Sequence, residues 1–177
     1  MVASPTTKTA FVTVGSTKFN ALIHSILQEE SLSALQVTGF THLVVQCGES
    51  TLPHPWDRMT ANQDHPEGLN VEIWKYKPSL SEHILEAGLI ISHAGSGTIL
   101  EALRARKKLI VVPNDTLLDN HQTELADALD NLGYVVSATP NTLPAEILSY
   151  DTTIWEPFPV FDGSNFAQLI DEELVYI

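Results

Sequence analysis

The chain has 177 residues, of which 44% are hydrophobic and 18% charged, enough for one domain with a single buried core. No apolar run approaches the roughly 20 residues of a membrane-spanning helix, and the single cysteine, Cys47, excludes an internal disulfide and a cysteine-based zinc site. Its 9 Lys and Arg against 22 Asp and Glu give a net charge of −13, which argues against nucleic-acid binding. An anionic ligand is still compatible with this charge if backbone amides and helix N-termini hold it.

The first part of the chain predicts buried strands separated by a helix and a loop. Residues 10–15, AFVTVG, form a short β-branched apolar run that ends at a glycine, which is typical of a buried strand. Residues 41–47 and 69–76 predict two further strands, and the proline-containing stretch 48–68 between them predicts a long surface loop. After the first strand the apolar residues have the spacing of a one-sided helix: Phe19, Leu22, Ile23, Ile26 and Leu27.

The middle of the chain alternates between the two element types. A helix is expected after Pro78, in SLSEHILEA, and the run LIIS at 89–92 predicts a fourth strand. A second helix is expected from about Ser96 to Arg106, and the run KLIVVP predicts a fifth strand.

The last part of the domain follows the same alternation. A helix is expected from about Asn120 to Leu132, and Gly133 suits the position just after its C-terminus. The run YVVSA predicts a sixth strand, and TPNTLPAEILSY predicts a short helix after it.

Apolar strands that alternate with amphipathic helices predict a parallel sheet that is covered on both faces. The expected fold is therefore a doubly wound, mostly parallel, Rossmann-like α/β domain. We expect residues 1–9 to be a flexible leader, residues 10–155 to form the domain, and residues 156–177 to form an extended segment and a helix. Right-handed crossovers place every strand-to-helix loop at the carboxyl edge of the sheet, where such folds bind ligands.

The loop after the fourth strand has the character of an anion site. His93 precedes the glycine-rich bend Gly95-Ser96-Gly97, which opens directly into a helix. Glycines let the backbone pass close to a ligand, and the N–H groups of a first helical turn carry positive partial charge. Glu101 lies in the second turn, within reach of ribose hydroxyls if a phosphate sits at the helix start.

Two other loops are expected at the same edge. The first, Gly15-Ser16-Thr17, repeats the arrangement after the first strand. The other loop, PNDTLLDNHQ at residues 113–122, supplies hydrogen-bonding side chains suited to a sugar: Asp119, Asn120, His121 and Gln122.

Structural roles remain open for each of these residues. The glycines can serve only tight turns, His93 can be an ordinary loop histidine, and Glu101 can be a solvated helix residue. Asn120 can merely cap its helix. Two familiar motifs do fail: Ala94 and Thr98 occupy the glycine positions of a nucleophile elbow, and GSGTIL lacks the third glycine of the dinucleotide fingerprint.

The residues that carry a family resemblance are HAGSGTILEAL, LIVVPNDTLLDNHQTELADAL and GYV. They resemble the sugar-nucleotide half of the two-domain glycosyltransferases of the GT-B fold, in the branch that includes the bacterial enzyme MurG. The stretches FVTVGSTKFNALI, WKYKPSL and PFPVFDGSNFAQLI resemble, more narrowly, the soluble catalytic subunits of the two-chain transferase that adds the second N-acetylglucosamine to dolichol-diphosphate-GlcNAc, in their fungal form.

The resemblance implies a role for each part of the site. Around the donor diphosphate it implies Gly15, Ser16, Thr17, His93, Gly95, Ser96 and Gly97. It implies that Glu101 holds the ribose, that His121 and Gln122, next to Asn120, contact the GlcNAc hydroxyls, and that Tyr76 and Lys77 flank the uracil.

The resemblance also implies a reaction that needs a second chain. It implies an inverting transfer from UDP-GlcNAc without metal or other cofactor, with the general base and the lipid acceptor supplied by a membrane-anchored partner chain. The expected location is cytoplasmic, at the cytosolic face of the endoplasmic reticulum. Three other classes remain: a regulatory sugar-nucleotide-binding module, an epimerase of similar fold, which the length disfavours, and an NAD-type Rossmann protein, which the missing fingerprint disfavours.

The tail predicts an amphipathic helix. Pro157 and Pro159 favour an extended segment, and Asp162 or Ser164 can cap the helix after it. Its apolar stripe either packs on its own domain or, as the resemblance favours, docks the partner chain; the stripe consists of Phe166, Leu169, Ile170 and Leu174.

Overall fold

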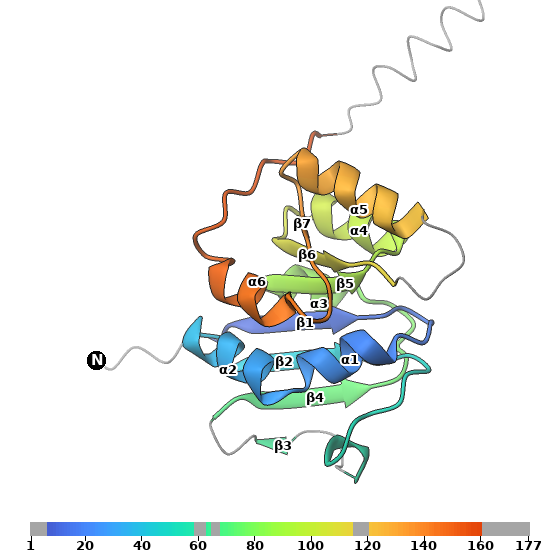
Figure 1. Ribbon diagram of the computed structural model, residues 1–177, viewed down its shortest axis with the longest axis vertical. Helices are drawn as coiled ribbons and strands as arrows, with labels where there is room; N and C mark the ends of the chain where they lie inside the picture. The colour runs from blue at the N-terminus through green and yellow to red at the C-terminus, as the bar shows by residue number, and fades with distance from the viewer. Residues whose placement is uncertain (1–6, 59–62, 65–67, 115–120, 161–177) are drawn as a thin grey trace, which may run out of the picture.

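The computed structural model describes residues 7–58, 63–64, 68–114 and 121–160, which form one α/β domain (Figure 1). Its sheet has the order β3-β4-β2-β1-β5-β6-β7, with every pair parallel except β3 against β4. The strands are β1 (Thr9–Thr13), β2 (His42–Gln46), β3 (Gln63–Asp64), β4 (Asn70–Trp74), β5 (Leu89–His93), β6 (Leu109–Val112) and β7 (Val136–Ser137). The predicted doubly wound, mostly parallel fold is confirmed.

In the part of the chain that the structure describes, helices cover both faces of the sheet, three on each. The helices are α1 (Asn20–Ile26), α2 (Glu29–Val37), α3 (Ser81–Glu86), α4 (Ser96–Arg104), α5 (His121–Asn131) and α6 (Leu143–Ser149). In Figure 1, α1, α2 and α6 lie in front of the sheet, and their buried side chains form one apolar cluster. The buried side chains of α3, α4 and α5 form the second cluster on the opposite face.

Strand β1 shows why the sheet needs both layers. Ala10 and Val12 belong to the first cluster and Phe11 to the second, and all three side chains are completely buried. Burying a side chain of the size of Phe11 stabilises the fold by about 1.5–3 kcal/mol. The uninterrupted apolar run in the sequence is therefore the pattern of a strand in the middle of the sheet.

Two parts of the expected layout need correction. The sequence pattern did not predict α2, and the stretch 48–68, expected to be one long loop, contains the short 3-10 helix Trp56–Arg58 and strand β3. Trp56 is buried in that stretch, where its Nε1 donates to the carbonyl oxygen of Leu27 at 3.2 Å. The prediction for Gly133 is confirmed, because it follows α5 with a φ of 73°, which favours glycine.

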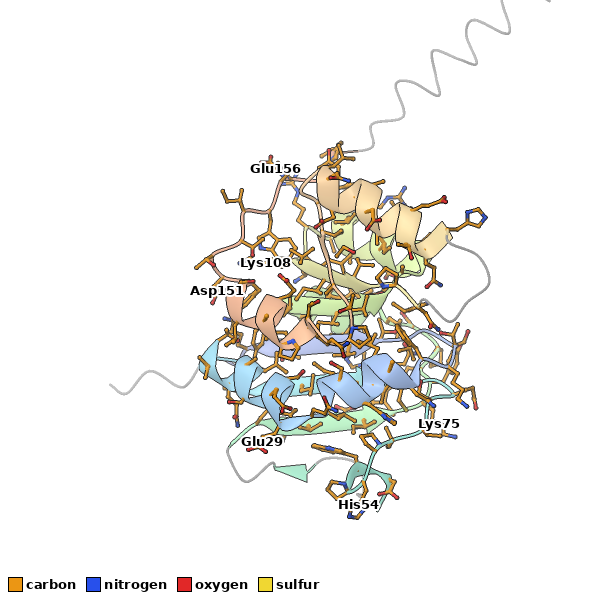
Figure 2. The ribbon with its side chains drawn as sticks, in the orientation of Figure 1. Glu29, His54, Lys75, Lys108, Asp151 and Glu156 are labelled. Atoms are coloured by element: carbon orange, nitrogen blue, oxygen red, sulfur yellow. The ribbon has the colours of Figure 1, made fainter. Side chains whose placement is uncertain are left out.

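The amino edge of the sheet holds a charged cluster. The Asp151 carboxylate lies 3.5 Å from Lys8 Nζ and 3.6 Å from Lys108 Nζ, and both ammonium groups lie over the Tyr150 ring. Figure 2 shows Lys108 and Asp151 at this edge, whereas Lys75, which follows β4, lies at the opposite, carboxyl edge. Among the described residues, no helix is both long and apolar enough to cross a bilayer.

The described chain ends with an extended segment that packs on the domain. Trp155 Nε1 donates to the carbonyl oxygen of Tyr150 at 3.1 Å, and the Glu156 amide donates to the carbonyl oxygen of Gly133 at 2.9 Å. The Phe158 ring meets Tyr134 edge to face. The predicted helix at 162–177, with Phe166, Leu169, Ile170 and Leu174, lies outside the described residues.

Candidate functional site

The carboxyl ends of adjacent parallel strands bring the predicted loops to one edge. In the sheet β2 lies beside β1, β1 beside β5, and β5 beside β6. The register pairs Thr13 with both Gln46 and Ser92, and His93 with Val112, so these strands end at nearly the same level. The loops that follow β1 and β5 therefore lie side by side, as the sequence predicts.

Two buried polar side chains, at the ends of β1 and β2, hydrogen-bond to each other next to these loops. Thr13 and Gln46 are at most 2% exposed, and the Thr13 hydroxyl donates to Gln46 Oε1. The same hydroxyl accepts the N–H of Gly15 at 2.9 Å, and Thr17 donates its hydroxyl to the Val14 carbonyl oxygen at 2.7 Å. The first loop is thus fixed from below by the end of its own strand, and Ser16 in its middle is exposed.

His93 lies between the two glycine-containing loops and is only 8% exposed. Its Nδ1 is 3.4 Å from the Thr13 carbonyl oxygen, and because a carbonyl can only accept, Nδ1 carries the proton in this contact. Burial lowers the pKa of His93, and the contact with Thr13 raises it by less. The imidazole in this position is therefore neutral near pH 7.

The glycines on either side of His93 make room for its ring. A Cβ on Gly95 would lie 2.6 Å from His93 Nε2, and a Cβ on Gly15 would lie 3.0 Å from His93 Cε1. Gly15 also has a φ of 61°, which side chains rarely adopt. These two glycines thus have a structural cause that the sequence pattern alone did not show.

Gly97 is different, because a Cβ added to it would meet no atom within 4 Å apart from its chain neighbours and the backbone of its own helix. It lies in the first turn of α4, next to the exposed Ser96, where N–H groups have no partner within the helix. Neither packing nor a positive φ calls for glycine here, so the surface over this turn can receive a group that approaches the backbone closely. An anion is favoured there by the helix dipole.

Glu101 is exposed in the second turn of α4, as predicted. One of its carboxylate oxygens, Oε1, accepts a hydrogen bond of 2.6 Å from the hydroxyl of Ser81, the first residue of α3. Ser81 is a residue that the sequence pattern did not single out, because only the packing of α3 beside α4 brings the two side chains together.

Tyr76 and Lys77, predicted at the uracil, follow β4. Tyr76 is 68% exposed and can serve as a binding surface. The Lys77 ammonium lies 3.3 Å from Glu72 Oε1, 2.9 Å from His83 Nε2 and 4.5 Å from the centre of the Trp74 ring. Lys77 is therefore engaged on the α3 side of the sheet, and its role toward a nucleotide stays a prediction.

The loop after β6 is described only at its ends. Asp119 and Asn120 lie outside the described residues. His121 begins α5, is exposed, and has its Nδ1 3.8 Å from a Glu124 oxygen. Gln122 Oε1 accepts the Asn114 N–H at 3.1 Å, so this side chain joins the start of α5 to the end of β6. The described residues contain no group of three or more His, Cys, Asp or Glu side chains that could hold a metal ion.

Comparison with known proteins identifies relatives over most of the chain. The model of the glycosyltransferase family 28 C-terminal domain matches residues 9–173. The chain is 34% identical to the UDP-N-acetylglucosamine transferase subunit ALG13 of Cryptococcus neoformans, over 95% of this chain and 97% of the relative. It is 31% identical to the subunit of the same name from Saccharomyces cerevisiae, over 94% and 96%. It is 39% identical to the mouse subunit of the same name over 77% of this chain, and the matched part is only 11% of that longer relative.

Solved structures agree with this relationship. The NMR solution structure of ALG13 superposes with a TM-score of 0.67 at 30% identity, covering 92% of this chain and 94% of that one. The crystal structure of Acinetobacter baumannii MurG superposes with a TM-score of 0.61 at 24% identity, over 86% of this chain and 42% of that one, and shares the fold. The chain belongs to the family of the glycosyltransferase family 28 C-terminal domain.

Proposed function

We propose that this chain is the donor-binding subunit of an inverting transferase that moves N-acetylglucosamine from UDP-GlcNAc to GlcNAc-diphosphodolichol. The observation that carries the proposal is the open surface over Gly97 at the start of α4, with the Glu101 carboxylate in the next turn. Support also comes from the curated relatives named UDP-N-acetylglucosamine transferase subunit, two of which this chain matches over nearly their full length.

The donor would lie across the carboxyl edge of the sheet. Its diphosphate would meet the amides of the first turn of α4 and the loop Gly15-Ser16-Thr17, and its ribose would meet Glu101. The GlcNAc group would then extend toward the start of α5, where His121 is exposed. Amides bring partial positive charge without lysine, which suits a chain whose net charge is −13.

The chemistry divides between two chains. The acceptor oxygen forms a bond to the anomeric carbon, while the bond from that carbon to the diphosphate breaks and its electron pair leaves with UDP. The amides at α4 would stabilise the charge that develops on the leaving diphosphate. The proton of the acceptor hydroxyl must pass to a general base, which we assign to a membrane-anchored partner that also holds the lipid. This chain would join that partner at the cytosolic face of the endoplasmic reticulum.

A transfer assay tests the proposal. Radiolabelled UDP-GlcNAc and a GlcNAc-diphospholipid acceptor are incubated with the chain alone, with a membrane fraction depleted of the chain, and with both. We expect labelled product only from the combined sample. Full activity of the depleted membranes would instead favour a regulatory sugar-nucleotide-binding module, and no activity in any sample, with UDP binding intact, would contradict the assigned acceptor.

A further inference from the structure

The hydroxyl of Ser81 contacts the carboxylate that we place at the ribose. Ser81 Oγ donates to Glu101 Oε1 at 2.6 Å, a distance typical of a charge-assisted O–H···O⁻ bond. The hydroxyl of Ser79 donates in turn to Ser81 Oγ at 3.3 Å, and the backbone N–H of Ser81 donates to Ser79 Oγ at the same distance. These contacts form a short chain of donors, Ser79 to Ser81 to Glu101, that ends on one carboxylate oxygen.

We propose that Ser81 is a positioning residue, which holds the Glu101 carboxylate in the orientation that receives the ribose hydroxyls of a uridine nucleotide. The inference rests on the proposed function, because it needs the ribose at Glu101. A glutamate has three side-chain torsions, and an exposed one samples several rotamers unless a partner holds it. The bond from α3 fixes a side chain of α4 before the ligand arrives, which reduces the entropy that binding must remove.

The bond leaves the carboxylate able to accept further hydrogen bonds. A carboxylate offers about four lone-pair sites, and Ser81 occupies one of them on Oε1. The other oxygen and the second lone pair of Oε1 can accept hydrogen bonds from the two vicinal ribose hydroxyls. Ser81 therefore does not compete with the ribose but narrows the directions from which it can be bound.

The fold itself does not depend on this hydroxyl. Ser81 is exposed, and the first turn of α3 is closed by a backbone bond from Ile84 to the Leu80 carbonyl oxygen. The N-cap residue, Leu80, makes no side-chain hydrogen bond, and the bond that Ser79 Oγ accepts comes from the backbone N–H of Ser81 and not from its hydroxyl. Ser81→Ala should therefore leave stability almost unchanged, and Ser81→Thr keeps a hydroxyl that can restore the contact.

The experiment measures the dissociation constants of UDP and 2′-deoxy-UDP by calorimetry for the full chain. We expect Ser81→Ala to weaken UDP binding about 3- to 10-fold, and to shrink the preference for UDP over 2′-deoxy-UDP by a similar factor. Ser81→Thr should bind both ligands within about twofold of the wild type. Ser33→Ala, which changes an exposed serine on α2, is the matched control and should have no effect.

The other possible results distinguish a failure of the positioning role from a failure of the proposed donor pose. If the wild type prefers UDP but Ser81→Ala keeps the full preference, or loses affinity for both ligands equally, the positioning role is wrong and the proposed function stands. If the wild type binds both nucleotides equally well, the ribose does not lie at Glu101. That result overturns this inference together with the proposed donor pose.

Discussion

His93 couples the ends of two neighbouring strands through one neutral ring. Its Nδ1–H points to the Thr13 carbonyl oxygen, and the ring fills the space that Gly15 and Gly95 leave. Because burial lowers its pKa below the ordinary value of 6.5, the unfolded chain takes up a proton on acidification before the folded chain does. The stabilisation from this histidine is therefore fully present above about pH 6.5 and decreases as the pH falls toward the folded pKa.

We predict that the free energy of unfolding of the wild type decreases between about pH 7 and 5.5 by more than that of His93→Gln. The largest difference that one histidine can cause is about 1.4 kcal/mol per pH unit in this window. Urea denaturation at several pH values measures it, with His121→Gln as a control because that ring is exposed. Parallel pH profiles for the wild type and His93→Gln would show that His93 titrates normally.

Glu101 is the carboxylate that we place at the ribose of the donor. Glu101→Gln replaces the carboxylate by an amide, so the ribose loses a charged acceptor and the hydrogen bond from Ser81 becomes weaker. The fold should tolerate the change, because the side chain lies on an exposed position of the helix. We expect UDP affinity to fall by about 1.5–3 kcal/mol, or roughly 10- to 150-fold, with the melting temperature unchanged. The matched control is Glu86→Gln on α3. Wild-type affinity in folded Glu101→Gln would remove this residue from the donor site.

The start of α4 contains two glycines with different functions, Gly95 at the N-cap and Gly97 in the first turn. A side chain at Gly95 would collide with the His93 ring, whereas a side chain at Gly97 would extend into open space. Gly95→Val and Gly97→Val are both expected to abolish binding of UDP, but for different reasons. Gly95→Val displaces His93 and lowers stability, while Gly97→Val leaves the fold intact and blocks the approach of the diphosphate.

Thermal unfolding with and without UDP separates these two effects. We predict that Gly97→Val unfolds within about 2 °C of the wild type and shows no shift on addition of UDP, because a ligand that no longer binds cannot stabilise the native state. Gly97→Ala adds only a methyl group and should keep part of the shift. A wild-type shift in Gly97→Val would place the diphosphate elsewhere, and a wild-type melting temperature for Gly95→Val would contradict the packing against His93.

The elements differ in how far the sequence predicts them. The buried strands are predictable because an apolar run such as residues 10–15 must be covered on both faces, and this alternation with helices also predicts that the loops share one edge. Strand β3 is not predictable from the sequence, since it has two residues and joins the sheet by pairing with β4. The contact between Ser81 and Glu101 depends on how α3 packs beside α4, and no local pattern encodes that packing.

For the whole molecule, the two edges of the sheet differ in kind. At the amino edge Asp151 forms ion pairs with Lys8 and Lys108, and both ammonium groups also lie over the Tyr150 ring. At the carboxyl edge the start of α4 and Glu101 are exposed. In the proposed complex the partner chain must face this second edge, because the lipid acceptor has to reach the anomeric carbon of the donor from there.

The tail follows a segment that is packed on the domain. The described contacts of Trp155, Glu156 and Phe158 hold the chain on its own domain up to that point, so removal of residues 162–177 leaves all of them in place. We propose that the stripe of Phe166, Leu169, Ile170 and Leu174 docks the partner chain, and the truncated chain tests this.

We predict that the chain truncated after residue 161 melts within about 2 °C of the full chain and keeps its shift with UDP, because neither the core nor the donor edge has changed. It should no longer co-purify with the membrane-anchored partner or restore transfer to depleted membranes. Leu169→Ser with Ile170→Ser should reproduce this loss, whereas Glu172→Gln, on the polar side of the same segment, should not. Partner capture at full strength by the truncated chain would assign the docking surface to the domain, and a large fall in melting temperature would show that the stripe packs on its own core.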